Sequence, residues 1–531
     1  MSRCDILISG GLLVDGTGDA AREADVAILD GRIAAIGPKL AVDATRTIDA
    51  RNQVVAPGFI DIKTHSDWTL PLNPKAESKI HQGVTTEVIG HCGYSCAPAL
   101  PGKAGILKDY LSPSAPWLTF IDQSFHDYLN SFPTTSTNIV PLVGHNTLRL
   151  MTMGLANRAC SNDELEQMAS LLEEALDAGA QGMSTGLFTP PGAFSKPEET
   201  IALAKIVKRK GGRYFTHLRD EANDVFSALD EAIDLGAQSG VHVQVVHMKL
   251  SGLDNWGKAD AMLARVAMAR EHGVAIDCDQ YPYTAASNPL KNLLPRWVQS
   301  DKLDEMMARL ADPANRARMR VEIDEHGLNN FGRIKDWEAI RISVSPNQSQ
   351  FAGRTIADLA KERGIDGLDC VCDYLIADKC ATRVLVDSIS EDDIQTMIKS
   401  AHVCVGSDGN CVAPYGITGQ GKPHPRFYGT FPRIIGHYSR DLGLIDLPLA
   451  IHKMTGASAH ALGFTDRGWL KPGCAADVTI FDPAEFAELA TYEKPHQYPA
   501  GASTMVLVNG TVTLDHAEHT GALAGHLLKR A

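Results

Sequence analysis

The sequence contains no run of about 18 apolar residues, so it offers no membrane-spanning helix. The first residues lack the apolar core and small-residue cleavage site of a secretory signal, and we therefore expect a cytoplasmic protein. No cluster of Lys and Arg stands out against a net charge of −14, which argues against a nucleic-acid partner. The 11 cysteines follow no framework spacing, so we expect most of them to be small buried residues in a reducing compartment.

The chain is too long for one small core and divides by pattern into three parts. A length of 531 residues suggests roughly two to four domains, or one large barrel with additions. Residues 1–56 alternate apolar and polar positions around Asp-Gly turns, which is typical of β-hairpins. The same signature returns in residues 465–531. We therefore expect both ends to build one small β-sandwich domain beside a large domain of residues 57–464.

The large middle part alternates eight strands with helical segments. This alternation predicts an α/β fold, a parallel (β/α)8 TIM-like barrel. Most units span about 30 residues, the size of one strand-helix unit, but the step from Tyr283 to Val403 is far longer. We therefore expect an insertion at about residues 285–350, which is a candidate lid over the barrel mouth. The expected strands lie within residues 54–62, 85–93, 138–145, 180–186, 213–218, 242–249, 274–283 and 401–409.

One of the helical segments carries clear end signals. Ser161 and Glu164 have the spacing of a capping box, in which each side chain satisfies a free backbone N–H. Apolar residues then recur at helical spacing, and Gly179 supplies a stop. The pattern predicts an amphipathic helix with one buried face between Ser161 and Gly179.

Nearly every expected strand ends in a side chain that can bind a metal or transfer a proton. In a barrel these strand ends share one face, the face where barrel enzymes hold their active sites. Cys92, His217 and His247 offer thiolate and imidazole ligands, and Asp408 offers a carboxylate. A metal hydrolase needs such ligands from several strands, an open coordination position and a nearby carboxylate. The constellation therefore predicts a metal-dependent hydrolase.

A series of segments along the chain carries a family resemblance. They are APGFIDIKTHSDWTL, QGVTTEVIGHCGYSCAP, LVGHNTLR, GMSTGLFTPPG, THLRDE, VVHMKLSG, DQYPYTA, GSDG, HPRFYGTFPR and TDRGWLKPGCAADVTIFDP. With these segments the sequence resembles the N-acyl-D-amino-acid deacylases (D-aminoacylases) of the amidohydrolase superfamily, in order and over nearly the whole chain. The resemblance implies a barrel with a small β-sandwich built from both termini.

The resemblance also implies a reaction, a cofactor and a ligand set. The reaction is hydrolysis of a small-molecule N-acyl-D-amino acid to a carboxylate and a free D-amino acid, with zinc as cofactor. The tight zinc site carries over to Cys92, His217 and His247, and the catalytic aspartate to Asp408. Zinc lowers the pKa of bound water toward ~7, so that hydroxide attacks the amide. Asp408 then takes the proton and delivers it to the leaving nitrogen.

Substrate binding is assigned to cationic and phenolic side chains near the strand ends. The resemblance implies that Lys249 and Tyr283 hold the substrate's carboxylate. Because the net charge is −14, an anionic substrate needs local positive charge, and Arg219 is expected to add to it. Plainer interpretations stay open, namely a surface charge for Lys249 and core packing for Tyr283. Neither the preferred D-amino-acid side chain nor the oligomeric state follows from the sequence.

The first matching segment departs from the family at Lys63. The family carries an HxH pair at this point, whereas this sequence has Lys63 followed by His65. A protonated lysine has no lone pair for a metal. Because the resemblance assigns the two histidines mainly to a second, weaker metal position, we expect one zinc per chain. His65 is then the one residue of the pair that can still contribute a ligand to a weak second metal site.

Three roles for Lys63 stay open at this point. Its ammonium group takes the place of the missing cation and keeps Asp408 ionised; or the lysine is carboxylated and acts as a ligand; or the replacement is inert. Two rival functions also stay open. One is another amide or cyclic-amide hydrolase of the dihydropyrimidinase type, although residues 180–186 lack the bridging lysine of those enzymes. The other is a catalytically inactive barrel that binds ligands.

Overall fold

The computed structural model describes residues 2–112, 115, 117–299, 302–501 and 504–530. Eight parallel strands form one sheet in the order β16-β12-β11-β10-β9-β8-β7-β6. A parallel bridge between Thr64 and Gly409 connects the two ends of this sheet, so it is nearly closed. The predicted (β/α)8 barrel is confirmed. Its strands are β6 (Phe59–Asp61), β7 (Val84–Ile89), β8 (Asn138–Gly144), β9 (Gly182–Gly186), β10 (Arg213–His217), β11 (His242–Val245), β12 (Ile276–Gln280) and β16 (Val403–Val405).

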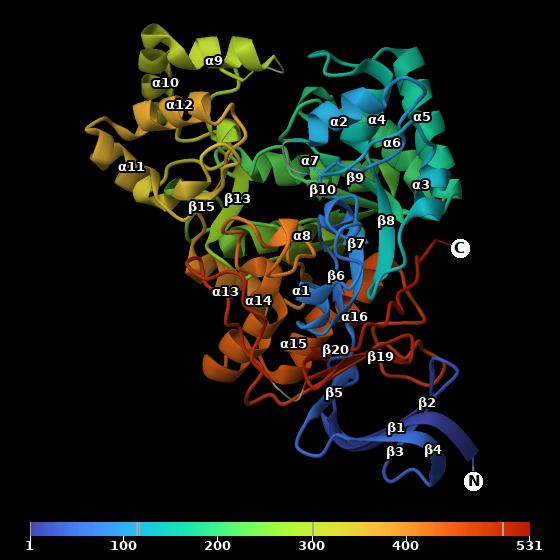
Figure 1. Cartoon of the computed structure of the whole chain (residues 1–531). Helices are drawn as coiled ribbons and strands as arrows, with labels where there is room; N and C mark the ends of the chain where they lie inside the picture. Colours follow the sequence, from blue (N-terminus) through green and yellow to red (C-terminus); the bar gives the residue numbers. More distant parts are fainter. Residues whose placement is uncertain (1, 113–114, 116, 300–301, 502–503, 531) are drawn as a thin grey trace.

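Helices pack around the strands of the barrel (Figure 1). Leu172, Leu203 and Leu229 from three successive helices pack with Val243 of β11 in one buried cluster. Among the described helices, none combines the length and the apolar character needed to cross a membrane. The barrel helices are α1 (Glu77–Ile80), α2 (Ala104–Leu111), α3 (Phe125–Ser131), α4 (His145–Met153), α5 (Asn162–Asp177), α6 (Pro197–Arg209), α7 (Val225–Ser239), α8 (Ala259–Glu271), α13 (Glu391–Lys399), α14 (Arg426–Arg433), α15 (Leu447–Met454) and α16 (Gly456–Leu462).

Helix α5 begins with the predicted capping box. The Glu164 N–H donates to Ser161 Oγ, and the Ser161 N–H donates to the Glu164 carboxylate at 2.8 Å. The predicted face is buried through Met168, Leu172 and Leu176. Thus both the start and the buried stripe of this helix follow from local sequence.

Replacing Ser161 with Ala should loosen the first turn of α5. The substitution removes the acceptor of the Glu164 N–H, and loss of an N-cap of this kind costs about 1 kcal/mol. Hydrogen exchange of the first-turn amides should therefore accelerate by roughly fivefold. Ser170→Ala is the matched control because Ser170 is exposed in the middle of the same helix. Equal exchange rates in the two variants would contradict the capping role.

Strands from both ends of the chain form one nine-stranded sheet. Its order is β20-β19-β18-β17-β5-β1-β2-β3, and β4 pairs with β1. The two chain ends meet where β17 pairs antiparallel with β5, and β5 continues directly into β6 of the barrel. The strands are β1 (Ser2–Leu13), β2 (Arg22–Leu29), β3 (Arg32–Gly37), β4 (Val42–Asp49), β5 (Val54–Pro57), β17 (Val478–Phe481), β18 (Met505–Val508), β19 (Thr511–Asp515) and β20 (Glu518–His519).

A separate module is inserted between β12 and β16 and lies at the opposite end of the molecule from the terminal strands (Figure 1). Its three antiparallel strands have the order β13-β15-β14, and its own apolar cluster includes Leu290, Ile340 and Leu375. The insertion was expected to end near residue 350, but it continues to Asp387, because β15 is the central strand that both others need. The elements are β13 (Ala285–Pro289), α9 (Leu303–Ala311), α10 (Pro313–His326), β14 (Ile340–Val344), α11 (Ile356–Arg363), α12 (Gly367–Ala377) and β15 (Arg383–Asp387).

Candidate metal centre and active-site cavity

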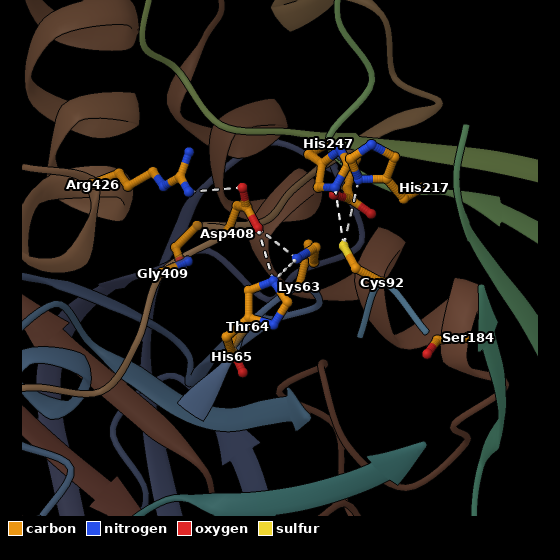
Figure 2. A network of polar contacts seen from close by, with 12 residues as sticks. Lys63, Thr64, His65, Cys92, Ser184, His217, His247, Asp408, Gly409 and Arg426 are labelled. Atoms are coloured by element: carbon orange, nitrogen blue, oxygen red, sulfur yellow. Dashed lines mark hydrogen bonds and ion pairs between the residues drawn. The ribbon is translucent and has the colours of Figure 1, made fainter. Parts of the chain in front are cut away.

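Three potential ligands converge at the carboxyl ends of the barrel strands (Figure 2). Cys92 Sγ lies 3.3 Å from His247 Nε2 and 3.6 Å from His217 Nδ1. The three ligand atoms all lie within 4.8 Å of one another. Cys92 follows β7, His217 ends β10, and His247 follows β11. The barrel thus brings Cys92 close to two histidines that lie 125 and 155 positions further along the chain.

The chemistry of this trio fits a metal ion. Burial lowers the pKa of His217 to about 4 and also depresses that of His247, so both imidazoles are neutral and keep a lone pair. Burial raises the pKa of the Cys92 thiol to about 11, whereas a bound metal would favour its thiolate. A thiolate with two imidazoles suits zinc better than magnesium or calcium, which prefer oxygen.

Glu221, which the sequence did not single out, lies beside both candidate histidine ligands. Its Oε1 lies 3.1 Å from His247 Nδ1, and its Oε2 lies 3.6 Å from His217 Nε2. If His247 Nδ1–H donates to this carboxylate, Nε2 keeps the lone pair that points at Cys92. Burial acts to raise the pKa of Glu221, but the histidines and Lys249 hold it well below its usual range. A carboxylate at this position favours the His247 tautomer that leaves Nε2 free for a metal.

Replacing Glu221 with Gln should weaken zinc binding by roughly 10- to 100-fold, because an uncharged amide no longer fixes the tautomer of His247. Competition with a chelator measures the affinity. Glu231→Gln is the matched control: Glu231 lies on α7, pairs with Arg219 and does not line the cavity. Equal zinc affinities for the two variants would remove Glu221 from this role.

The backbone is unusual at three of the predicted site residues. Cys92, His247 and Asp408 have φ values of 54°, 38° and 47°, a left-handed region that non-glycine residues rarely adopt. Each of these residues follows the end of a barrel strand. Ser184 on β9 holds the first turn, because its hydroxyl donates to Gly90 O and accepts from the Gly93 N–H. Such local strain is concentrated at functional sites.

Asp408 lies beside the trio and is held by two cations. Lys63 Nζ is 2.5 Å from its Oδ1, and Arg426 is 2.8 Å from its Oδ2 (Figure 2). The Asp408 N–H also donates to Lys63 O, which is part of the closure of the barrel between β6 and β16. Burial acts to raise the pKa of Asp408, but Arg426 and Lys63 keep it far below its usual value. The carboxylate is therefore ionised.

His65 faces Lys63 and Asp408 rather than the trio. Its Nε2 lies 2.8 Å from Lys63 Nζ and 3.5 Å from Asp408 Oδ1, and its ring stacks on Trp68. Burial and the charge of Lys63 lower the pKa of His65 to about 4, so the neutral ring accepts a hydrogen bond from the ammonium. Lys63 Nζ thus occupies the space between a histidine nitrogen and a carboxylate.

A cavity of about 1960 Å³ opens above these groups, between the barrel and the inserted module. His65, Cys92, His217, His247 and Asp408 lie at its base. Lys249 also lines it, with Nζ 2.6 Å from Glu221 Oε1. The candidate ligands are therefore reachable by a small molecule.

Two residues expected to bind the substrate do not line this cavity. Tyr283 donates its hydroxyl to Glu488 at 2.7 Å, because the chain turns at Pro282. Tyr281 lines the cavity instead, and its buried hydroxyl has no hydrogen-bond partner among the described residues. Arg219 pairs with Glu231 on α7. Arg426 does line the cavity, and its guanidinium lies 4.5 Å from the centre of the Tyr281 ring.

Comparison with known proteins agrees with this geometry. A D-aminoacylase of Alcaligenes xylosoxydans xylosoxydans is 35% identical over 530 residues, 99% of this chain and 98% of that protein. The structure of an N-acyl-D-glutamate deacylase from Bordetella bronchiseptica, complexed with zinc and a phosphonate inhibitor, matches with a TM-score of 0.82 at 32% identity, covering 100% of both chains. A structure concerned with one-metal activation and second-metal attenuation in D-aminoacylase matches with a TM-score of 0.81 at 34% identity, covering 99% of this chain and 100% of that one. The amidohydrolase family model matches residues 46–514. The chain belongs to the amidohydrolase family.

Proposed function

We propose that the protein hydrolyses the amide bond of N-acyl-D-amino acids, giving a carboxylate and a free D-amino acid. The observation that carries this proposal is the convergence of Cys92, His217 and His247 beside Asp408 at the base of one cavity. The named relatives act as D-aminoacylase and N-acyl-D-glutamate deacylase, which supports the same reaction class.

In this proposal Cys92, His217 and His247 hold one zinc ion. Zinc bound there supplies Lewis-acid chemistry, lowering the pKa of water and polarising the acyl carbonyl. Glu221 keeps His247 in the required tautomer, with its carboxylate 3.1 Å from His247 Nδ1.

Asp408 transfers the proton. Its carboxylate is ionised and accepts a proton from the attacking water. It then gives this proton to the amide nitrogen, which leaves poorly unless it is protonated. Lys63 and Arg426 each hold one of its two oxygens, so the carboxylate has a defined orientation before the substrate arrives.

Lys249 provides the positive charge for the substrate's α-carboxylate, together with the Tyr281 hydroxyl. Both residues line the cavity, and Lys249 Nζ lies 5.6 Å from the centre of the Tyr281 ring. The ion pair of Lys249 with Glu221 positions the ammonium next to the candidate zinc ligands. A substrate bound there presents its amide to the base of the cavity.

For Lys63 we favour the role of an ammonium that replaces a second metal ion. Its Nζ lies between His65 Nε2 at 2.8 Å and Asp408 Oδ1 at 2.5 Å. A carboxylated lysine would add a negative group directly against Asp408, which Coulomb repulsion disfavours. An inert replacement would not explain why this buried amine has two partners.

The rival functions have less support. A dihydropyrimidinase-type site needs a lysine on a mid-barrel strand, and β9 instead carries Ser184, which bonds to the backbone of the Cys92 loop. An inactive barrel has no need for the Glu221 carboxylate beside two candidate ligands or for a paired Asp408.

The zinc-loaded protein should hydrolyse N-acetyl-D-methionine much faster than its L form. Activity should disappear with a chelator and return with added zinc. Release of the free amino acid measures the reaction, with dihydrouracil and a hydantoin as substrates of the rival class. Hydrolysis of the cyclic amides alone would favour the dihydropyrimidinase type. No turnover of any of these compounds by zinc-loaded protein would favour the inactive barrel.

A further inference from the structure

A buried ion pair outside the cavity contacts the segment that carries Asp408. Lys79 belongs to the short helix α1, and its ammonium donates to Asp61 Oδ2 at 2.7 Å and to Ser407 Oγ at 2.8 Å. Asp61 ends β6, and Ser407 directly precedes Asp408 in the chain. All three side chains are 0% exposed, and none of them lines the cavity. A substrate in the cavity therefore does not touch this pair.

The helix that carries Lys79 is itself fixed to the chain that follows Asp408. The Ser78 N–H donates to Val412 O at 3.1 Å, and the Val412 N–H donates to Ser78 Oγ at 3.0 Å. Helix α1 thus contacts this part of the chain at two places, through Lys79 at Ser407 and through Ser78 at Val412. The ammonium is therefore held in place by a firmly attached element.

The ion pair fixes the backbone on both sides of Asp408. Asp61 Oδ1 accepts the Ser407 N–H at 2.9 Å, and Ser407 Oγ accepts the Gly409 N–H at 3.0 Å. Asp61 Oδ1 also accepts the Lys63 N–H at 3.4 Å, so one carboxylate connects the segments of Lys63 and Asp408. The Asp408 N–H donates to Lys63 O. Each backbone N–H from residue 407 to residue 409 therefore has an acceptor within this network.

The conformation of Asp408 explains why such support is needed. Its φ of 47° lies in the left-handed region, which a non-glycine residue keeps only where the surrounding structure holds it. Its carboxylate must also meet Lys63 with one oxygen and Arg426 with the other, at 2.5 Å and 2.8 Å (Figure 2). A small rotation of the segment would break this arrangement.

A role in stability alone does not account for the pair. Burying two charges costs desolvation, so apolar side chains of similar volume often stabilise a protein as well as a buried ion pair does. Apolar side chains would, however, leave the Ser407 N–H without an acceptor. The other buried acid of this region, Glu87, accepts from Ser66 and Thr137 instead. What the ion pair supplies is therefore a fixed acceptor next to Asp408.

We propose that Lys79, Asp61 and Ser407 are positioning residues for the reaction: through the backbone of Asp408 they hold its carboxylate in the orientation that transfers the proton. This inference rests on the proposed function. Loosening the support should lower kcat and leave KM almost unchanged, because the orientation of a reacting group affects the transition state more than it affects substrate binding.

Ser407→Ala is the main test, because it removes the hydroxyl that joins Lys79 to the Gly409 N–H and changes no charge. On N-acetyl-D-methionine we expect kcat to fall by about 10-fold or more, with KM and zinc content near those of the wild type. Ser407→Thr keeps the hydroxyl and should restore most of the lost rate. Lys79→Met should also lower kcat, and Lys79→Arg should retain more of it because the positive charge next to Asp61 remains.

The matched controls are Ser458→Ala and Lys453→Met. Both residues are buried and do not line the cavity. Lys453 donates to Ser400 O, and Ser458 donates to Lys453 O. These substitutions remove buried hydrogen bonds of the same kinds without touching residues 407–409. Their kcat should stay at the wild-type value even where the temperature of thermal unfolding falls.

A double-mutant cycle shows whether the effect passes through Asp408. In the Asp408→Asn background, Ser407→Ala should change kcat by less than about twofold, because the positioned group no longer transfers the proton. A merely structural effect would lower kcat by the same factor in both backgrounds.

Two results overturn this inference and leave the proposed function intact. One is an equal factor in the two backgrounds of the cycle. The other is a wild-type kcat in both Ser407→Ala and Lys79→Met. Because Ser407→Ala removes a single oxygen atom, it keeps the test available even if Lys79→Met does not fold. No turnover of any N-acyl-D-amino acid by the zinc-loaded wild type overturns the proposed function, and this inference with it.

Discussion

Asp408→Asn should lower kcat by roughly 10²- to 10⁴-fold on the best N-acyl-D-amino acid, because the amide has nearly the same shape but accepts no proton. The carboxylate lies beside the candidate zinc ligands, and both its oxygens are already paired with cations that orient it. An asparagine retains part of this pairing, so the zinc content should remain that of the wild type. The measurement is kcat together with metal analysis of the same preparation.

The control for this substitution is Asp109→Asn. Asp109 lines the same cavity but is exposed at its rim. Its kcat should stay within about twofold, as expected of a surface position away from the reacting groups. If Asp408→Asn keeps a wild-type kcat with zinc bound, another group transfers the proton and the mechanism proposed for Asp408 is wrong.

Lys63→Met should shift the acidic limb of the kcat/KM profile to higher pH. In the wild type, Lys63 and Arg426 hold the pKa of Asp408 far below its usual range, so the base stays ionised at acidic pH. Removing one positive neighbour raises the pKa of the carboxylate, so its ionised fraction falls at a higher pH than before. A shift of about one pH unit corresponds to a tenfold lower rate on the acidic side. At pH values above the acidic limbs of both profiles, kcat/KM should be the same for the two enzymes.

The matched control is Lys63→Arg, which keeps the positive charge next to Asp408 and should keep the limb near its wild-type position. An identical profile for Lys63→Met at all pH values would show that the lysine is an inert replacement. Such a result would contradict the proposal that the Lys63 ammonium replaces a second metal ion between His65 and Asp408.

Metal analysis is an independent test of the proposal that the Lys63 ammonium replaces a second metal ion. Wild-type protein should bind one equivalent of zinc per chain, because Lys63 fills the position between His65 and Asp408. Lys63→His rebuilds the HxH pair, so a second equivalent should bind more weakly. Two full equivalents of zinc per wild-type chain would contradict the single-zinc model.

Local patterns in the sequence were sufficient for the fold and for the residues that converge. The eight strands follow from apolar runs that end in polar residues, and α5 follows from its capping box and apolar spacing. The candidate trio was predictable because a barrel sends every strand end to one face. Whether Cys92, His217 and His247 bind zinc stays a prediction, although their ligand atoms are close together.

The partners of the candidate ligands were not predictable in the same way. Glu221 stands four residues after His217 in a loop, and only the folded chain brings it to His247 as well. Tyr281 and Tyr283 flank Pro282, and the sequence does not distinguish their roles. The turn at Pro282 decides that Tyr281 lines the cavity, whereas Tyr283 bonds to Glu488. The sequence also could not show that Arg219, which was expected to add positive charge for an anionic substrate, pairs with Glu231.

What the sequence alone determined is therefore the list of reactive side chains and the topology that gathers them. Strand periodicity and short-range signals depend on neighbouring residues, so they can be read without the rest of the chain. Only the tertiary structure decided which charges meet. Lys63 and Asp408 are separated by most of the barrel in sequence and become partners because β6 and β16 close the barrel side by side.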